Sequence, residues 1–119
     1  MNKLQNYELT ILVGIDEQRI SICEDVLMDA EPIFQKMDHD MSRGWQLGRQ
    51  FVPSPNKLQR CQIAADRLLT ALHTENSASM NLMAGFILSR LPGVASVNIN
   101  DEGETNETMF YNTDNALIS

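Results

Sequence analysis

The chain has 119 residues, of which 43% are hydrophobic, and its formal net charge is −7. This length fits one domain, spanning 1–119, and the apolar content suffices for an ordinary core. The negative charge opposes binding to nucleic acid and to anionic lipid. We therefore expect a protein partner or self-association, with no nucleic acid and no membrane.

The longest apolar runs are far shorter than the roughly 20 residues that cross a bilayer, and the start of the chain has no signal-peptide pattern. Cys23 and Cys61 lie far apart and show no CxxC spacing, so we expect both to be reduced. These features predict a cytoplasmic protein.

The first 20 residues can be interpreted in two ways. Apolar residues alternate with others, which is typical of a strand: Tyr7, Leu9, Ile11, Val13 and Ile15. The run ELTIL is equally compatible with a helix, and the sequence leaves this choice open.

A first helix is predicted over 21–52. Ser21 and Glu24 have the spacing of a capping box, and Pro32 predicts a kink or a short break. Helical periodicity carries the apolar stripe beyond Met41 to Trp45, which becomes a core anchor. Arg43 and Arg49 then lie on the solvated face of this helix. Two glycines in it either allow another backbone to approach or only accommodate the tryptophan: Gly44 and Gly48.

A second helix is predicted over 55–74, with Ser54 as its N-cap and Pro55 in its first turn. Its core face carries residues at spacings of three and four: Leu58, Cys61, Ala65, Leu68 and Leu72. Ile63 lies opposite this face, between Arg60 and Arg67. We expect these three residues to form an exposed surface that takes the acidic tail or a partner's carboxylates.

A third helix, over 77–91, follows a connection so short that it must lie antiparallel to the second. It is apolar on two sides, because Leu82 and Phe86 point away from the main stripe. Either the terminal strands cover these two side chains, or they form an exposed patch that a second copy of the chain buries.

The last segment, 94–119, is acidic and rich in asparagine. It has no lysine or arginine, and its five carboxylates supply most of the net charge. Alternating residues around 94–99 and 109–111, with a turn near 101–104, predict a short hairpin. The expected fold is thus mainly α: a small antiparallel bundle of three helices with a β-hairpin-like extension, the order of its tail left open.

No motif for catalysis or cofactor binding is found. Residues 37–41, MDHDM, hold possible metal ligands, but on a helix they diverge. Residues 98–103 match part of a calcium loop, but Met109 stands where a bidentate Glu is required, so a turn is favoured. We expect no metal, no cofactor and no catalytic residues.

The leading functional hypothesis is a small, acidic, non-enzymatic interaction or accessory module, which includes a homodimer. The alternative is a small-ligand or cofactor binder that uses the space around Trp45, Met37, Met41 and Phe86. A third hypothesis is an enzyme whose activity would require Arg43, Arg49 or His73.

Overall fold

The computed structural model describes residues 5–119 and shows an α/β fold in place of the predicted helical bundle. Its elements follow the order β1 (Asn6–Val13), β2 (Asp16–Cys23), α1 (Glu24–Met41), β3 (Trp45–Leu47), β4 (Gln50–Val52), α2 (Lys57–His73), α3 (Ser77–Arg90), β5 (Val94–Asn98), a 3-10 turn η1 (Thr105–Glu107), β6 (Met109–Asn112) and β7 (Leu117–Ile118).

Five strands form one mixed sheet in the order β2-β1-β5-β6-β7. The β1–β2, β5–β6 and β6–β7 pairs are antiparallel, whereas β1 and β5 are parallel. The strand interpretation of the N-terminal segment is therefore correct, and the predicted C-terminal hairpin is confirmed. This hairpin is not an extension of a bundle, because its first strand lies in the centre of the sheet.

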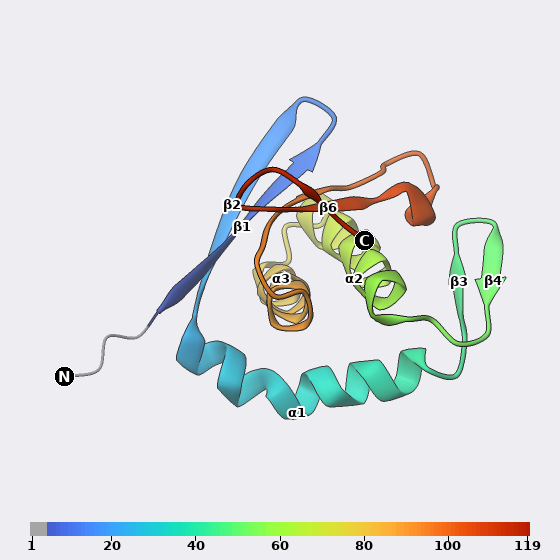
Figure 1. Ribbon diagram of the computed structural model, residues 1–119, viewed down its shortest axis with the longest axis horizontal. Helices are drawn as coiled ribbons and strands as arrows, with labels where there is room; N and C mark the ends of the chain where they lie inside the picture. The colour runs from blue at the N-terminus through green and yellow to red at the C-terminus, as the bar shows by residue number, and fades with distance from the viewer. Residues whose placement is uncertain (1–4) are drawn as a thin grey trace.

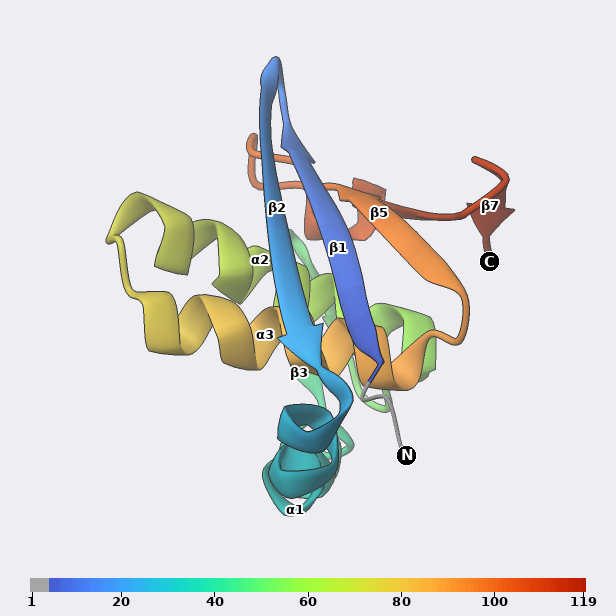
Figure 2. The same ribbon diagram turned by 90° about the vertical axis from the view of Figure 1, so that its left-hand side faces the viewer.

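Helices α2 and α3 lie side by side against one face of the sheet, and α1 runs past the end of β2 below α3 (Figures 1 and 2). The core lies between these layers. The side chains of the strands alternate accordingly, since Leu9 and Ile11 are buried while Glu8 and Arg19 are exposed. The exposed side chains lie on the opposite face of the sheet, away from the helices.

The predicted helix 21–52 is wrong at both ends. Residues 21–23 complete β2, and Cys23, without a side-chain cap, occupies the N-cap position of α1. The helix ends at Met41 because Gly44 (φ +111°) and Gly48 (φ +58°) have left-handed backbones that an α-helix cannot contain. Pro32 does not break α1, which continues through it.

Residues 45–52 form the separate two-stranded hairpin β3–β4 with a two-residue turn, Gly48–Arg49. Gly48 has a positive φ and Arg49 does not, as in a type II′ turn. A Cβ at Gly48 would lie 2.8 Å from the carbonyl oxygen of Gly103. The close approach of another backbone at Gly48 is thus real, but it involves the 101–104 loop and not α3.

The second and third helices agree with the prediction. Helix α2 begins two residues later than expected, because its N-cap is Asn56 and not Ser54, and Asn56 forms a capping box with Gln59. Asn56 Oδ1 accepts a hydrogen bond from the Gln59 N–H at 2.8 Å, and Gln59 Oε1 accepts one from the Asn56 N–H at 2.9 Å. Glu75, with φ +54°, makes the tight connection to α3.

Candidate binding groove

The most pronounced hollow of the described residues arises where β1 and β5 diverge. Their parallel pairing is limited to three residue pairs, Thr10–Leu12 with Ser96–Asn98. The pairing of β5 with β6 is interrupted by a register shift between Val94 and Ser96, which leaves Ala95 as an extra residue. Such a bulge bends and twists its strand. On the N-terminal side of Thr10 and Ser96 the two strands therefore separate. Figure 2 shows the first parts of β1 and β5 lying apart.

The groove has a volume of about 1000 Å³, at the upper end of the range for small-ligand sites. Its walls come from β1, the first two turns of α1, the end of α3, the 91–93 loop and the start of β5. The lining residues are Gln5, Asn6, Tyr7, Glu8, Thr10, Glu24, Leu27, Met28, Glu31, Leu88, Ser89, Leu91, Pro92, Gly93, Val94, Ala95 and Thr113.

The lining combines an apolar floor with acidic walls. Leu88, Leu91 and Val94 are buried beneath the groove, whereas Met28 is 67% exposed. Among residues 5–119, the lining includes three glutamates and no lysine, arginine or histidine. Cations are therefore attracted to this hollow, and anions are repelled.

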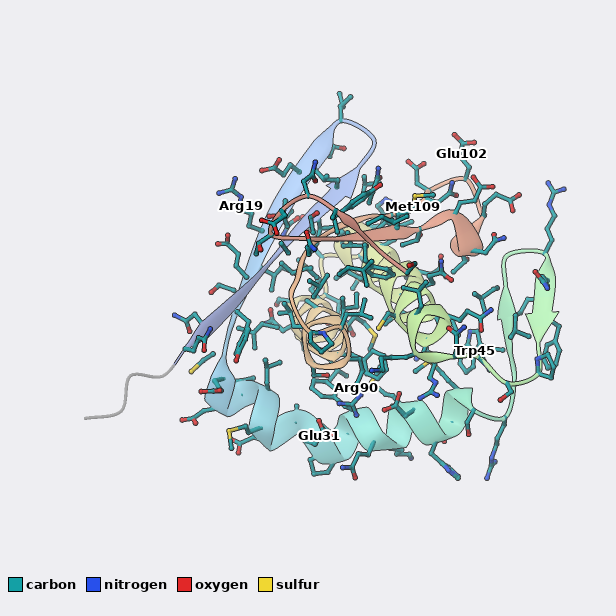
Figure 3. The ribbon with its side chains drawn as sticks, in the orientation of Figure 1. Arg19, Glu31, Trp45, Arg90, Glu102 and Met109 are labelled. Atoms are coloured by element: carbon teal, nitrogen blue, oxygen red, sulfur yellow. The ribbon has the colours of Figure 1, made fainter. Side chains whose placement is uncertain are left out.

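One of these glutamates, Glu31, is tied to the neighbouring helix. Arg90 Nη1 and Nη2 donate to its two carboxylate oxygens at 2.8 and 2.9 Å, and Arg90 Nε donates to Asp38 Oδ2 at 2.9 Å. Figure 3 shows Glu31 and Arg90 pointing toward each other between α1 and α3. The hydrogen bonds from Arg90 lower the pKa of Glu31, so this carboxyl stays charged and helps to fix one wall.

The other two glutamates have weaker partners. Tyr7 Oη donates to Glu24 Oε1 across a long 3.5 Å. Glu8 is exposed, and no salt bridge involving it or Glu24 occurs within the described residues. The two carboxylates are accordingly the ones available to a ligand.

The predicted contact surface at Leu82 and Phe86 is not exposed. Phe86 is completely buried and packs edge-to-face on Phe34, with ring centroids 5.9 Å apart. Leu82 is half-buried against the same core. Of the two alternatives for α3, the intramolecular one is correct, because the sheet and α1 cover its second apolar side.

The predicted surface on α2 is also wrong as described, since Ile63 is only 2% exposed. Arg60 donates to Asp38 at 3.0 Å, and the Arg67 guanidinium lies 4.8 Å from the centre of the Trp45 ring. Both arginines thus meet side chains of the 38–45 region instead of the acidic tail.

The remaining predicted arginines lie away from the groove. Arg43 is exposed, and Arg49, at the tip of the β3–β4 hairpin, is 91% exposed with its Nε 3.6 Å from Glu104 Oε1. Their solvent exposure agrees with the prediction, although a hairpin and a loop carry them instead of a helix.

Trp45 is half-buried on β3, and its side chain extends from the β3–β4 hairpin toward α2, as Figure 3 shows. It borders a hollow of only about 100 Å³ that also includes Met37 and Met41. This space lies below the range for small-ligand sites. Another cavity, of about 230 Å³, lies between the β1–β2 hairpin and α2 and includes His73.

The cysteines and the MDHDM segment lie on α1 and α2 or at the start of α1. Burial raises the pKa of the Cys61 thiol to about 12, with a further contribution from the charge of Asp38, and both cysteines are free. His39 is exposed while Met41 is buried, so these side chains diverge as predicted. No group of three or more His, Cys, Asp or Glu side chains that could hold a metal ion occurs in residues 5–119.

The calcium-like segment forms a turn, as the sequence favoured. Asn100 Oδ1 accepts hydrogen bonds from the N–H groups of Glu102 and Glu104, at 2.9 and 3.0 Å. The buried Gln62 side chain donates to the carbonyl oxygens of Asn106 and Thr108, which fixes the loop on α2.

The divergence of β1 and β5 is the feature that sequence reasoning missed. Its only local signal is the loss of strict alternation at Ala95–Ser96 between the buried Val94 and Val97.

No helix in the described part of the chain is long and apolar enough to cross a membrane. No protein-family model, curated protein or solved structure matches this chain.

Proposed function

We propose that this chain is a small, acidic, non-enzymatic interaction module of the cytosol, which holds a segment of a partner protein in the groove between β1 and β5. The observation that carries this proposal is the groove itself, with about 1000 Å³ of space, an apolar floor and acidic walls. Apolar contact area with polar groups at its rim is the usual composition of a protein contact site.

The chemistry of the groove supports binding over catalysis. Its lining has no cysteine or histidine, and the pKa of Glu31 is lowered. A general acid at neutral pH needs a raised carboxyl pKa, and a nucleophile needs an activating base. The acidic lining also favours a protein partner over nucleic acid. Two unpaired cysteines are consistent with a cytosolic location.

The small-ligand alternative around Trp45 has less support, because that hollow holds only about 100 Å³. Self-association through Leu82 and Phe86 is not part of the proposal, since Phe86 is buried in the core. The groove replaces both as the contact surface.

Affinity capture with a filled groove tests this proposal. Ala95 is a half-buried lining residue, so Ala95→Trp places a large side chain in the hollow, whereas Ala78→Trp adds the same side chain at an exposed position of α3 outside it. The wild type and Ala78→Trp should capture the same partner from the native cells, and Ala95→Trp should lose it. Equal capture by both variants would remove the groove from the proposed function.

A further inference from the structure

Strand β1 has an unpaired backbone edge inside the groove. Leu12 accepts a hydrogen bond from the N–H of Ile99, so the backbone of Leu12 faces the β5 side. Because successive residues of a strand direct their backbone groups to opposite sides, Glu8 and Asn6 face this side too. Pairing with β5 begins only at Thr10. Within residues 5–119, no strand therefore lies opposite the N–H and C=O groups of Asn6 and Glu8.

This free edge has the dimensions of a short strand site. At about 3.3 Å per residue, the stretch from Asn6 to Leu9 offers roughly 13 Å of strand. A segment of three to four extended residues fits this length. Extended peptides bind many proteins in this way, with main-chain hydrogen bonds supplying affinity and alternate side chains supplying specificity.

The two sides of the groove would select different side chains of such a segment. The side chains that point toward the helices meet the buried Leu88, Leu91 and Val94. The side chains that point outward lie beside Glu8, which shares the exposed face of β1. Apolar residues suit the inner positions, and basic residues suit the outer ones.

We propose that the partner segment is an extended, basic peptide, with apolar and basic residues in alternation, that adds a strand to β1. This inference rests on the proposed function and specifies its ligand. The peptide chain satisfies the free backbone groups of Asn6 and Glu8. Its outward-pointing cations meet the carboxylate of Glu8, and they complement the acidic lining of the groove.

The other long edge of the sheet, the outer side of β2, is a weaker candidate. It carries Asp16, Glu17 and Arg19, all exposed, and charged residues of this kind protect an edge strand against pairing. Arg19 points away from the molecule in Figure 3. By the same alternation, the N–H groups of Arg19 and Ser21 face this outer side. Their exchange rates therefore report on binding at the β2 edge and not at β1.

Amide hydrogen exchange followed by NMR distinguishes the two edges. The probe is a mixture of acetylated and amidated hexapeptides with Lys at every second position and Val, Leu, Phe or Met between. At a peptide concentration ten times Kd, exchange at Asn6 and Glu8 should slow by about tenfold, because only the free fraction exchanges. Exchange at Arg19 and Ser21 should not change.

Two control mixtures separate the backbone from the charge. The same peptides methylated at every backbone nitrogen have no backbone N–H to donate to the C=O groups of Asn6 and Glu8, and their methyl groups prevent the close approach of a strand. They should therefore not slow exchange at Glu8. Peptides with Glu in place of Lys should not bind. Glu8→Gln should weaken the Lys peptides about two- to fivefold, as expected for one exposed ion pair, whereas Glu102→Gln, on a distant loop, should leave binding unchanged.

Each contrary result has a definite meaning. Slowed exchange at Arg19 and Ser21 instead of Glu8 would overturn the assignment to β1, and equal binding of the Glu peptides would overturn the basic partner. Failure of all probes to bind would overturn the inference as a whole. If Ala95→Trp still abolished capture of the native partner, the groove would remain the proposed binding site with another kind of occupant.

Discussion

The guanidinium of Arg90 donates two parallel hydrogen bonds, of 2.8 and 2.9 Å, to the carboxylate of Glu31, and these bonds join the end of α3 to the middle of α1. The same guanidinium lies 5.6 and 5.4 Å from the ring centres of Phe34 and Phe86. Only 15% of the Arg90 side chain is exposed. One wall of the groove therefore depends on this residue.

Arg90→Met should lower the free energy of unfolding by about 1.5–3 kcal/mol, the range for hydrogen bonds to charged groups. The loss arises because Glu31 loses both hydrogen bonds from Arg90 and Asp38 loses one of its two arginine partners. Urea denaturation measures it. Arg90→Lys keeps the charge but cannot make the bidentate contact, so it should recover only part of the loss. Full stability in Arg90→Met would show that the helix contact does not need the arginine.

Acid should weaken the same contact. Because Arg90 lowers the pKa of Glu31 below its usual value of 4.5 in the folded state, the unfolded chain takes up the proton first as pH falls. The contribution of Glu31 to stability is thus fully present above about pH 4.5 and is lost as pH falls through the folded pKa. Glu31→Gln should give a shallower fall of stability in this window. An identical slope in both proteins would contradict the role given to this pair.

The two cysteines should differ in reactivity. The pKa of Cys61 is raised to about 12 by burial, and its side chain is completely inaccessible, whereas Cys23 is partly exposed. Iodoacetamide should therefore modify Cys23 alone in the native protein and both thiols in urea. Mass spectrometry of tryptic peptides assigns the modified residue. Rapid native modification of Cys61 would mean that the core around it opens.

The two β-hairpins provide a matched pair of glycines. Gly14 and Gly48 begin two-residue turns with φ near +60°, but a Cβ meets nothing within 4 Å at Gly14, while at Gly48 it meets the Gly103 carbonyl oxygen at 2.8 Å. Gly14→Ala should cost about 1–2 kcal/mol for the left-handed backbone alone. Gly48→Ala should cost more, because the hairpin must also move away from the 101–104 loop. Thermal unfolding compares them, and equal costs would contradict the close contact.

The helices of the second half and the C-terminal strands β5 and β6 could be predicted from local patterns. Apolar spacing of three and four residues defines α2 and α3, and the alternation around 94–99 and 109–111 defines β5 and β6. The assignment of residues 45–52 failed because Trp45, Gly48 and Val52 also fit a helical stripe. The runs WQL and QFV are joined by two residues, Gly48–Arg49, of which the first is glycine. This pattern was the better signal for a hairpin.

The groove could not be predicted, because it depends on a parallel pairing between segments more than 80 residues apart in the chain. Local periodicity indicates that β5 is a strand and leaves β1 open between strand and helix, and it gives neither their register nor the point where they separate. The same limitation explains the error at Ile63 and the choice left open at Phe86. Ile63 was judged exposed from its own helix, and Phe86 was left either covered or exposed, whereas packing against other elements buries both.

Photo-crosslinking from α1 tests the central claim, that a partner occupies the groove. Met28 and Val26 are both exposed on this helix, at 67% and 53%, but only Met28 lines the groove. A benzophenone amino acid is placed at each position in turn, and the native cells are irradiated. We predict a crosslink to one partner protein from position 28 and none from position 26. The same product from both positions, or none from position 28, would contradict the claim.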